Sequence, residues 1–169
     1  DNSEDRPVID LRELNSYIVK RHFKMDGIHT VAELLRPRDQ LTRIDLHKAY
    51  FHVPVHPSHQ RYLAFMVDGV HYCFQAMPFG LTSAPRTFSK LVSVIITFIR
   101  SAYHVRVVYY LDDILLLHRC GKQAAEDCTL LIVRLLVRLR FLINWDKSRL
   151  QASMQTEFLG WTVDSVRMC

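Results

Sequence analysis

The chain has 169 residues, of which 49% are hydrophobic and 23% charged, and it carries a net charge of +5. This length and hydrophobic content predict one domain over residues 1–169 with a single sizeable core. The positive charge suits a polyanionic partner, because affinity for nucleic acid comes largely from neutralising phosphates with Lys and Arg. No apolar run reaches the roughly 20 residues of a membrane span, so we expect no membrane association.

The cysteines predict an intracellular protein. Cys73, Cys120, Cys128 and Cys169 form no C-x-x-C pair, and the first residues do not resemble a signal peptide. We therefore expect reduced thiols, with nucleus and cytoplasm both open.

The first half of the chain predicts short elements. Thr30 and Glu33 have the spacing of a capping box, which predicts a helix over residues 30–36 that stops before Pro37. A strand-like segment follows and ends at Asp45. Asp68-Gly69 separates two β-prone segments and predicts a hairpin.

The second half predicts two longer helices. One begins after Ser83, a suitable cap, and runs to about residue 100. The other begins near residue 121, where apolar residues recur at helical spacing and predict one buried face. That face would comprise Cys128, Leu131, Ile132, Leu135, Leu136 and Leu139.

An acidic pair interrupts the apolar run of residues 107–117. The run predicts two buried strands joined by a tight turn at Asp112-Asp113. Carboxylates beside so much apolar surface are costly unless they are compensated, and a divalent cation would compensate them. The alternative is a solvated Asp-Asp turn.

The position of Asp45 favours a metal site over a solvated turn. An Asp at one strand end facing an Asp-Asp turn between two other strands gives the oxygen-rich pocket that a pair of Mg²⁺ ions requires. Two such ions catalyse phosphoryl transfer in polymerases and nucleases.

Five motifs in order resemble a reverse transcriptase of a retrotransposon. They are residues 6–15 (RPVIDLRELN), 45–51 (DLHKAYF), 77–85 (MPFGLTSAP), 110–113 (YLDD) and 158–161 (FLGW). Phe79 and the six residues after it resemble the gypsy type. Residues 27–31 and 141–148 are closer to the DIRS type.

The resemblance implies an α+β fold: a polymerase palm with part of the fingers, built on an antiparallel sheet with helices packed on one face. Thumb and ribonuclease H domains would lie outside these residues. Asp45, Asp112 and Asp113 would be catalytic and would bind two Mg²⁺ or Mn²⁺ ions. The partners would be an RNA or DNA template with its primer and deoxynucleoside triphosphates.

Five residues correspond to the nucleotide site of the family: Arg6, Lys48, Ala49, Tyr50 and Phe79. The resemblance implies that Arg6 grips the triphosphate, that Tyr50 excludes ribonucleotides and that Phe79 packs on the nucleotide. The alternatives are a surface arginine and two core aromatics. Lys48 departs from the family, since many relatives carry an acid there.

Four further residues correspond to primer and leaving-group positions. Tyr110, Leu159 and Gly160 match primer-binding positions, and Lys147 matches a lysine beside the leaving pyrophosphate. A plain surface lysine is the alternative for Lys147.

Two other functions stay open at this stage. The chain could be a relic palm that binds nucleic acid without polymerising, or the polymerase part of a parent protein that also carries ribonuclease H. The oligomeric state is not predicted by any of these patterns.

Overall fold

The computed structural model describes residues 9–168, which form two compact units. The smaller unit comprises residues 9–23 and Tyr50–Phe88, and the larger comprises Lys24–Ala49 and residues 89–168. That residues 1–169 make a single domain stays a prediction.

The smaller unit contains short elements and one β-hairpin. Its elements are α1 (Arg12–Ser16), α3 (Pro57–Gln60), η2 (Arg61–Leu63), β2 (Ala64–Val67) and β3 (Val70–Cys73), while η1 (Ala49–His52) starts at the junction with the larger unit. The predicted hairpin at Asp68-Gly69 is confirmed, and both turn residues have positive φ, 49° and 76°. The Asn15 side chain ties α1 to the loop after β3, because it donates to the Gly80 carbonyl and accepts from the Thr82 N–H, both at 2.8 Å.

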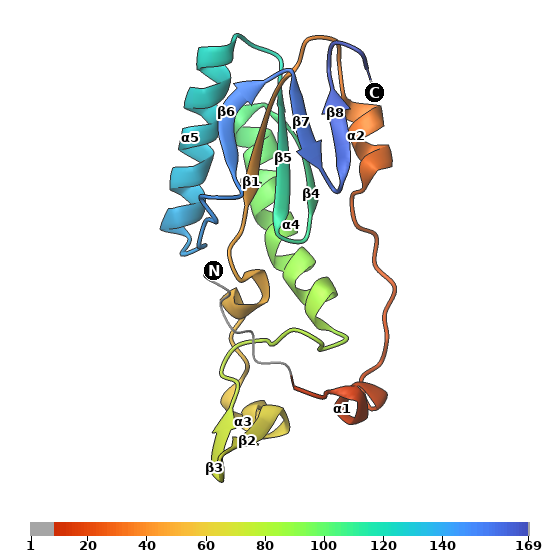
Figure 1. The fold of residues 1–169 in the computed structure, drawn as a ribbon, viewed down its shortest axis with the longest axis vertical. Helices are drawn as coiled ribbons and strands as arrows, with labels where there is room; N and C mark the ends of the chain where they lie inside the picture. The colour runs from red at the N-terminus through yellow and green to blue at the C-terminus, as the bar shows by residue number, and fades with distance from the viewer. Residues whose placement is uncertain (1–8, 169) are drawn as a thin grey trace. The chain divides into compact units, whose positions relative to one another are not determined.

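A four-stranded antiparallel sheet forms the centre of the larger unit (Figure 1). The strand order is β4-β5-β1-β6, and the strands are β1 (Gln40–Asp45), β4 (Arg106–Tyr110), β5 (Asp113–His118) and β6 (Arg149–Ser153). The central strand β5 is buried on both faces, which explains why residues 114–117 are continuously apolar rather than alternating.

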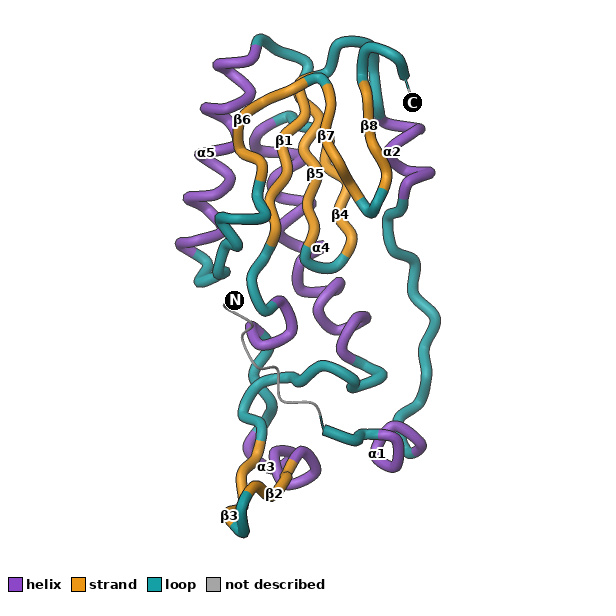
Figure 2. Tube along the Cα trace, viewed as in Figure 1, coloured by secondary structure: helices purple, strands orange, loops and turns teal. Residues whose placement is uncertain are grey.

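Two long helices cover one face of this sheet, α4 (Ala84–Tyr103) and α5 (Lys122–Arg138). In Figure 2 they are the two longest purple segments. Phe88, Val92, Ile96 and Ile99 of α4 are buried at helical spacing, and α5 packs against β1 and β6. The predicted α+β architecture, an antiparallel sheet with helices on one face, is confirmed. No helix within residues 9–168 is both long and apolar enough to cross a bilayer.

The buried face of α5 differs from the predicted one. Leu131 and Leu139 are each 48% exposed, whereas Ala125 and Thr129 are completely buried. The predicted stripe was wrong at these positions because residues 130–139 are apolar almost all round the helix, so hydrophobic spacing alone does not select a face.

The other face of the sheet contacts two smaller elements. These are α2 (Ile28–Leu34) and a separate hairpin of β7 (Gln155–Phe158) and β8 (Trp161–Asp164). They share one buried cluster with the sheet, made up of Val31, Leu35, Leu41, Val108, Leu115, Leu117, Phe158 and Val163.

Helix α2 begins two residues before the predicted start. Thr30 is therefore its third residue rather than its cap, and its hydroxyl accepts a 3.4 Å hydrogen bond from the Gly27 N–H. Helical structure ends at Leu34, ahead of Pro37 as predicted.

Candidate active site

The strand register brings the three predicted carboxylates to one end of the sheet. Asp45, the last residue of β1, is paired with Asp113, the first residue of β5. A two-residue turn, Leu111-Asp112, joins β4 to β5, and Leu111 has a left-handed φ of 53°. The Asp112 carbonyl accepts a 2.8 Å hydrogen bond from the N–H of Leu46, the residue after Asp45. The acidic pair thus lies at a hairpin tip beside Asp45, as the sequence predicts.

The surroundings of Asp113 shift its pKa. Burial is the largest cause and, together with the negative charges of Asp45 and Asp112, raises the pKa of Asp113 to about 7 against the opposing effect of the Arg43 cation. Arg43 Nε lies 3.4 Å from Asp113 Oδ1, and both side chains are less than a fifth exposed. Neither of these two atoms has a hydrogen-bond partner within residues 9–168, so one buried carboxylate oxygen is left unsatisfied.

The acidic end of the sheet fits a divalent cation in its chemistry. Carboxylate oxygens are donors that Mg²⁺ and Mn²⁺ prefer, and Asp45 is paired with Asp113 directly beside the Asp112 turn. Within the described part of the chain, however, no three His, Cys, Asp or Glu side chains are grouped so that they could hold one ion together. Because Asp113 lies against Arg43, Asp45 and Asp112 are the candidate ligands.

The predicted leaving-group residue, Lys147, lies in a turn bonded to Asp45. The Asn144 N–H donates to the Asp45 carbonyl at 2.8 Å, and the Asp45 N–H donates to the Ser148 hydroxyl at 3.0 Å. Ser148 in turn donates to the Asn144 carbonyl at 2.6 Å. The Lys147 side chain itself is exposed. Residues 144–148, called the Lys147 turn below, are therefore fixed to the backbone of a predicted catalytic residue.

The predicted primer-binding residues gather around one cluster. Leu159 and Gly160 form the turn between β7 and β8, with φ of 52° and 78°. No atom lies within 4 Å of where a Gly160 Cβ would stand, so glycine is favoured there by its backbone conformation rather than by lack of space. Tyr110 and Leu159 both pack against the buried cluster beneath α2.

Two predicted nucleotide-binding residues directly follow the β1 segment. Ala49 is buried and Lys48 is exposed, with a left-handed φ of 51°. An Asp tolerates this conformation better than a Lys, because its short side chain can hydrogen-bond locally. The left-handed conformation of Lys48 thus carries a backbone strain of roughly 1 kcal/mol.

Tyr50 and Phe79 contact each other in the smaller unit. Their ring centroids are 5.0 Å apart, and Tyr50 also meets Phe88 edge-on at 5.9 Å. Tyr50 is buried at 9% exposure, whereas Phe79 is 43% exposed. Phe79 is therefore not a plain core residue, while Tyr50 has the packing expected of either a core aromatic or a rigid gate. Arg6 lies outside the described residues.

Sequence reasoning gave no role to Arg43 or Ser148, which both contact the predicted site. For Arg43 a signal existed: it precedes Asp45 by two residues on a strand, so both side chains point to the same face. For Ser148 no local pattern reveals the contact, because its partner Asp45 is 103 residues away in sequence.

The chain belongs to the family described as reverse transcriptase (RNA-dependent DNA polymerase), whose model matches residues 1–163. It is 25% identical over 158 residues to the transposon Tf2-3 polyprotein of Schizosaccharomyces pombe, covering 94% of this chain and 12% of that protein. It is 30% identical over 111 residues to the retrovirus-related Pol polyprotein from transposon 297 of Drosophila melanogaster, covering 66% of this chain and 10% of that protein. These relatives support a retrotransposon reverse transcriptase domain; the DIRS or gypsy type stays a prediction.

Solved structures of foamy virus enzymes have the same fold. The native prototype foamy virus protease-reverse transcriptase matches with a TM-score of 0.76 at 26% identity, over 93% of this chain and 20% of that chain. A foamy viral protease-reverse transcriptase in complex with RNA/DNA hybrid matches with a TM-score of 0.74 at 19% identity, over 94% and 21%.

Proposed function

We propose that this chain carries out template-directed DNA synthesis by two-metal nucleotidyl transfer. The single observation that carries the proposal is the register of β1 and β5, in which Asp45 faces Asp113 beside the Asp112 turn. Family membership supports the reaction type. The chain spans about 12% of the length of the first curated relatives, so the activity of the whole protein is part of the proposal.

In this proposal the primer 3′-hydroxyl oxygen bonds to the α-phosphorus of a deoxynucleoside triphosphate, and the bond to the β-phosphate oxygen breaks, releasing pyrophosphate. Bound Mg²⁺ or Mn²⁺ would stabilise charge on the attacking and leaving oxygens. Asp45 and Asp112 would be the metal ligands, and Asp113 would complete the acidic cluster.

The remaining residues would position substrates. Lys147 would stand near the pyrophosphate, where its ammonium can neutralise charge or donate a proton. Tyr110, Leu159 and Gly160 would contact the primer. Lys48 and Ala49 would offer backbone groups to the triphosphate, which Arg6 would bind through its guanidinium.

The template-primer is proposed from similarity and charge. One similar foamy virus enzyme is described in complex with RNA/DNA hybrid and another with double-stranded DNA. The net charge of +5 on this chain suits the same kind of partner.

Metal binding gives a direct test. Titration of Mn²⁺ followed by electron paramagnetic resonance should detect bound ion in the wild type and at least tenfold weaker binding in Asp112→Asn, because the variant loses one of two charged ligands. Asp127→Asn, an exposed carboxylate on α5, is the matched control and should bind like the wild type. Equal affinity in all three proteins would refute the proposed site.

The second candidate is a palm that binds nucleic acid without polymerising. The observation that favours it is that three acidic side chains are not grouped around one point within residues 9–168. A primer-template that binds in a gel-shift assay but is never extended, with Mg²⁺ and all four nucleotides present, would support this candidate over the first.

A further inference from the structure

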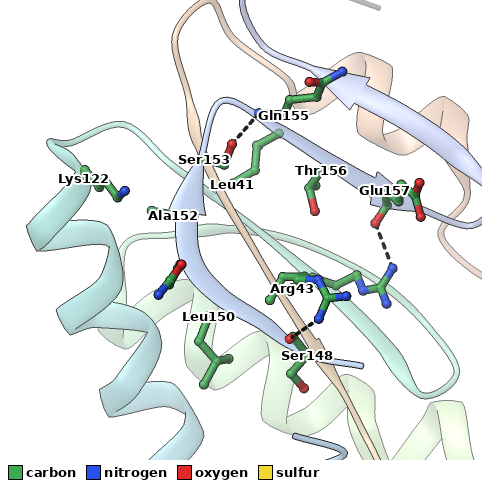
Figure 3. A pocket seen from close by; sticks show the side chains of 12 residues that line it. Leu41, Arg43, Lys122, Ser148, Leu150, Ala152, Ser153, Gln155, Thr156 and Glu157 are labelled. Carbon is green, nitrogen blue, oxygen red and sulfur yellow. Dashed lines mark hydrogen bonds between the residues drawn. The ribbon is translucent and has the colours of Figure 1, made fainter. Parts of the chain in front are cut away.

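One half-buried arginine, Arg43, contacts three segments of the candidate site. The Arg43 guanidinium donates from Nη1 to the Glu157 carbonyl at 2.9 Å and from Nη2 to the Lys147 carbonyl at 3.0 Å. Its third nitrogen, Nε, lies 3.4 Å from Asp113 Oδ1. Figure 3 shows the bond to Glu157.

The partners of Arg43 are distant in sequence and differ in predicted role. Asp113 opens the strand after the acidic turn, Lys147 belongs to the turn fixed to Asp45, and Glu157 lies in β7, next to the predicted primer-binding turn. Arg43 itself lies on β1, two residues before Asp45 and on the same face. A single side chain thus connects the acidic end of the sheet to both neighbouring segments.

A bulge between β1 and β6 lies next to the contact of Arg43 with β7. Between the pairs Leu41–Ser153 and Arg43–Arg149, β1 has one residue and β6 has three, so β6 bends away from β1. The hollow at this bend measures about 690 Å³ and is lined by residues of β1, β6 and β7 (Figure 3). Within residues 9–168, the β7–β8 hairpin is a separate sheet with no ladder hydrogen bonds to the four-stranded one. Ser165, directly after β8, bonds to Arg38 and Asp39 directly before β1, and at the other end of the hairpin the Arg43 guanidinium supplies a hydrogen bond from β1 to β7.

We propose that Arg43 is a positioning residue that sets the primer-binding hairpin β7–β8 and the Lys147 turn in place relative to the acidic cluster. The effect of Arg43 on catalysis rests on the proposed function. The link that Arg43 makes between the β7–β8 hairpin, the Lys147 turn and the acidic cluster is a property of the fold and does not depend on that function. Only a planar, forked cation suits the position, since it bonds two carbonyl oxygens while a third nitrogen faces a carboxylate. A lysine keeps the charge beside Asp113 but presents a single donor group.

Hydrogen exchange measured by mass spectrometry tests the coupling in the 169-residue chain. In Arg43→Lys, amide exchange over residues 155–164 and 144–148 should become about tenfold faster, the factor expected from losing one charge-assisted hydrogen bond. Exchange over β5 should stay unchanged, because its ladder does not depend on the guanidinium.

Arg149→Lys is the matched control. Arg149 is the strand partner of Arg43 and lines the same hollow, yet within residues 9–168 its guanidinium bonds to the nearby carbonyls of Asp146 and Ser148 and not to β7. It should leave exchange in the β7–β8 hairpin unchanged. Unchanged exchange in Arg43→Lys, uniformly faster exchange throughout the chain, or equal effects of the two variants would each overturn the proposal.

Steady-state primer extension tests whether Arg43 affects primer binding and catalysis. Arg43→Lys should raise KM for primer-template about tenfold, because the displaced hairpin would contact the primer, while KM for the nucleotide changes by less than about twofold. The displaced Lys147 turn should lower kcat instead, because its lysine would act on the leaving pyrophosphate in the transition state. Equal changes in the two KM values would overturn the positioning role. A wild type that binds no Mn²⁺ and extends no primer would refute the proposed function, and the exchange result would still decide whether Arg43 couples the two segments.

Discussion

Among single residues, Tyr50 has two possible roles, one in substrate selection and one in core packing. The resemblance assigns it to the exclusion of ribonucleotides, and its ring is held by contacts with Phe79 and Phe88. A gate must be rigid to be effective, because the two sugar types differ by one 2′-hydroxyl. Burial of Tyr50 is thus compatible with a gate and with plain core packing, so substitution is needed to decide.

We predict that Tyr50→Val increases ribonucleotide incorporation relative to deoxyribonucleotide incorporation by about 10²-fold, the discrimination that a pocket gains by rejecting an added hydroxyl. The measurement is single-nucleotide extension with each sugar type. The variant should also lose about 2 kcal/mol of stability, because a packed aromatic is truncated.

Phe88→Leu is the control for this prediction. Phe88 is fully buried and contacts Tyr50, so its truncation destabilises the same aromatic group without removing the tyrosine. It should melt earlier and keep the sugar preference of the wild type. If both variants lose incorporation of the two sugars equally, Tyr50 is a core residue only.

At the scale of elements, a buried polar group joins α5 to the sheet. His118 Nε2 lies 3.1 Å from the Thr42 hydroxyl and 3.2 Å from the Thr129 hydroxyl, and Thr129 donates to the Ala125 carbonyl at 2.8 Å. Burial is the largest cause and, together with the Arg106 cation, lowers the pKa of His118 to about 4 against the opposing effect of the Asp39 carboxylate. His118 is therefore neutral in the folded protein at pH 7.

The lowered pKa of His118 predicts that its contribution to stability is lost in mild acid. The unfolded state binds a proton on His118 near pH 6.5 and the folded state only near pH 4, so stability falls as pH decreases between these values. The contribution amounts to about 3 kcal/mol. Urea unfolding at pH 7, 5.5 and 4.5 should show that acidification costs His118→Gln less stability than it costs the wild type. The raised pKa of Asp113 adds stability as pH falls over the same range, but it does so in both proteins and cancels in the comparison. His29→Gln, at an exposed histidine, should follow the wild type, and a decrease in His118→Gln equal to that of the wild type would contradict the prediction.

The same elements show how far sequence reasoning reaches. The strands of the acidic hairpin and the Asp68-Gly69 turn follow from local patterns, and the locations of Asp45 and Asp113 follow from them. The buried face of α5 does not follow from local patterns. It includes the polar residue Thr129, whose buried hydroxyl is satisfied by a hydrogen bond to the Ala125 carbonyl, and hydrophobic spacing does not identify such a residue. The contacts of Arg43 were also not predictable, since its carbonyl partners are 104 and 114 residues away along the chain.

At the scale of the whole molecule, binding and chemistry should depend on opposite charges. The net charge of +5 attracts phosphates, while the acidic cluster that we propose to be catalytic repels them. A polymerase needs both the positive surface charge and the acidic cluster, whereas a relic palm that only binds nucleic acid needs the positive charge alone. Measuring the two properties on one variant therefore separates the two candidate functions.

We predict that Asp112→Asn binds a primer-template duplex at least as tightly as the wild type in the absence of divalent metal, because one repelling carboxylate is removed, and that it extends the primer at least about 10²-fold more slowly. For both proteins, a plot of log Kd against log salt should be a straight line with a slope of about 0.9 per phosphate contacted. Lys122→Gln, at an exposed lysine outside the acidic cluster, should leave extension unchanged and can lower the slope only by the one contact it removes. Weaker duplex binding by Asp112→Asn without metal would mean that the carboxylate supports the fold of the hairpin tip rather than the chemistry. Extension by Asp112→Asn at the wild-type rate would mean that the acidic cluster is not the active site.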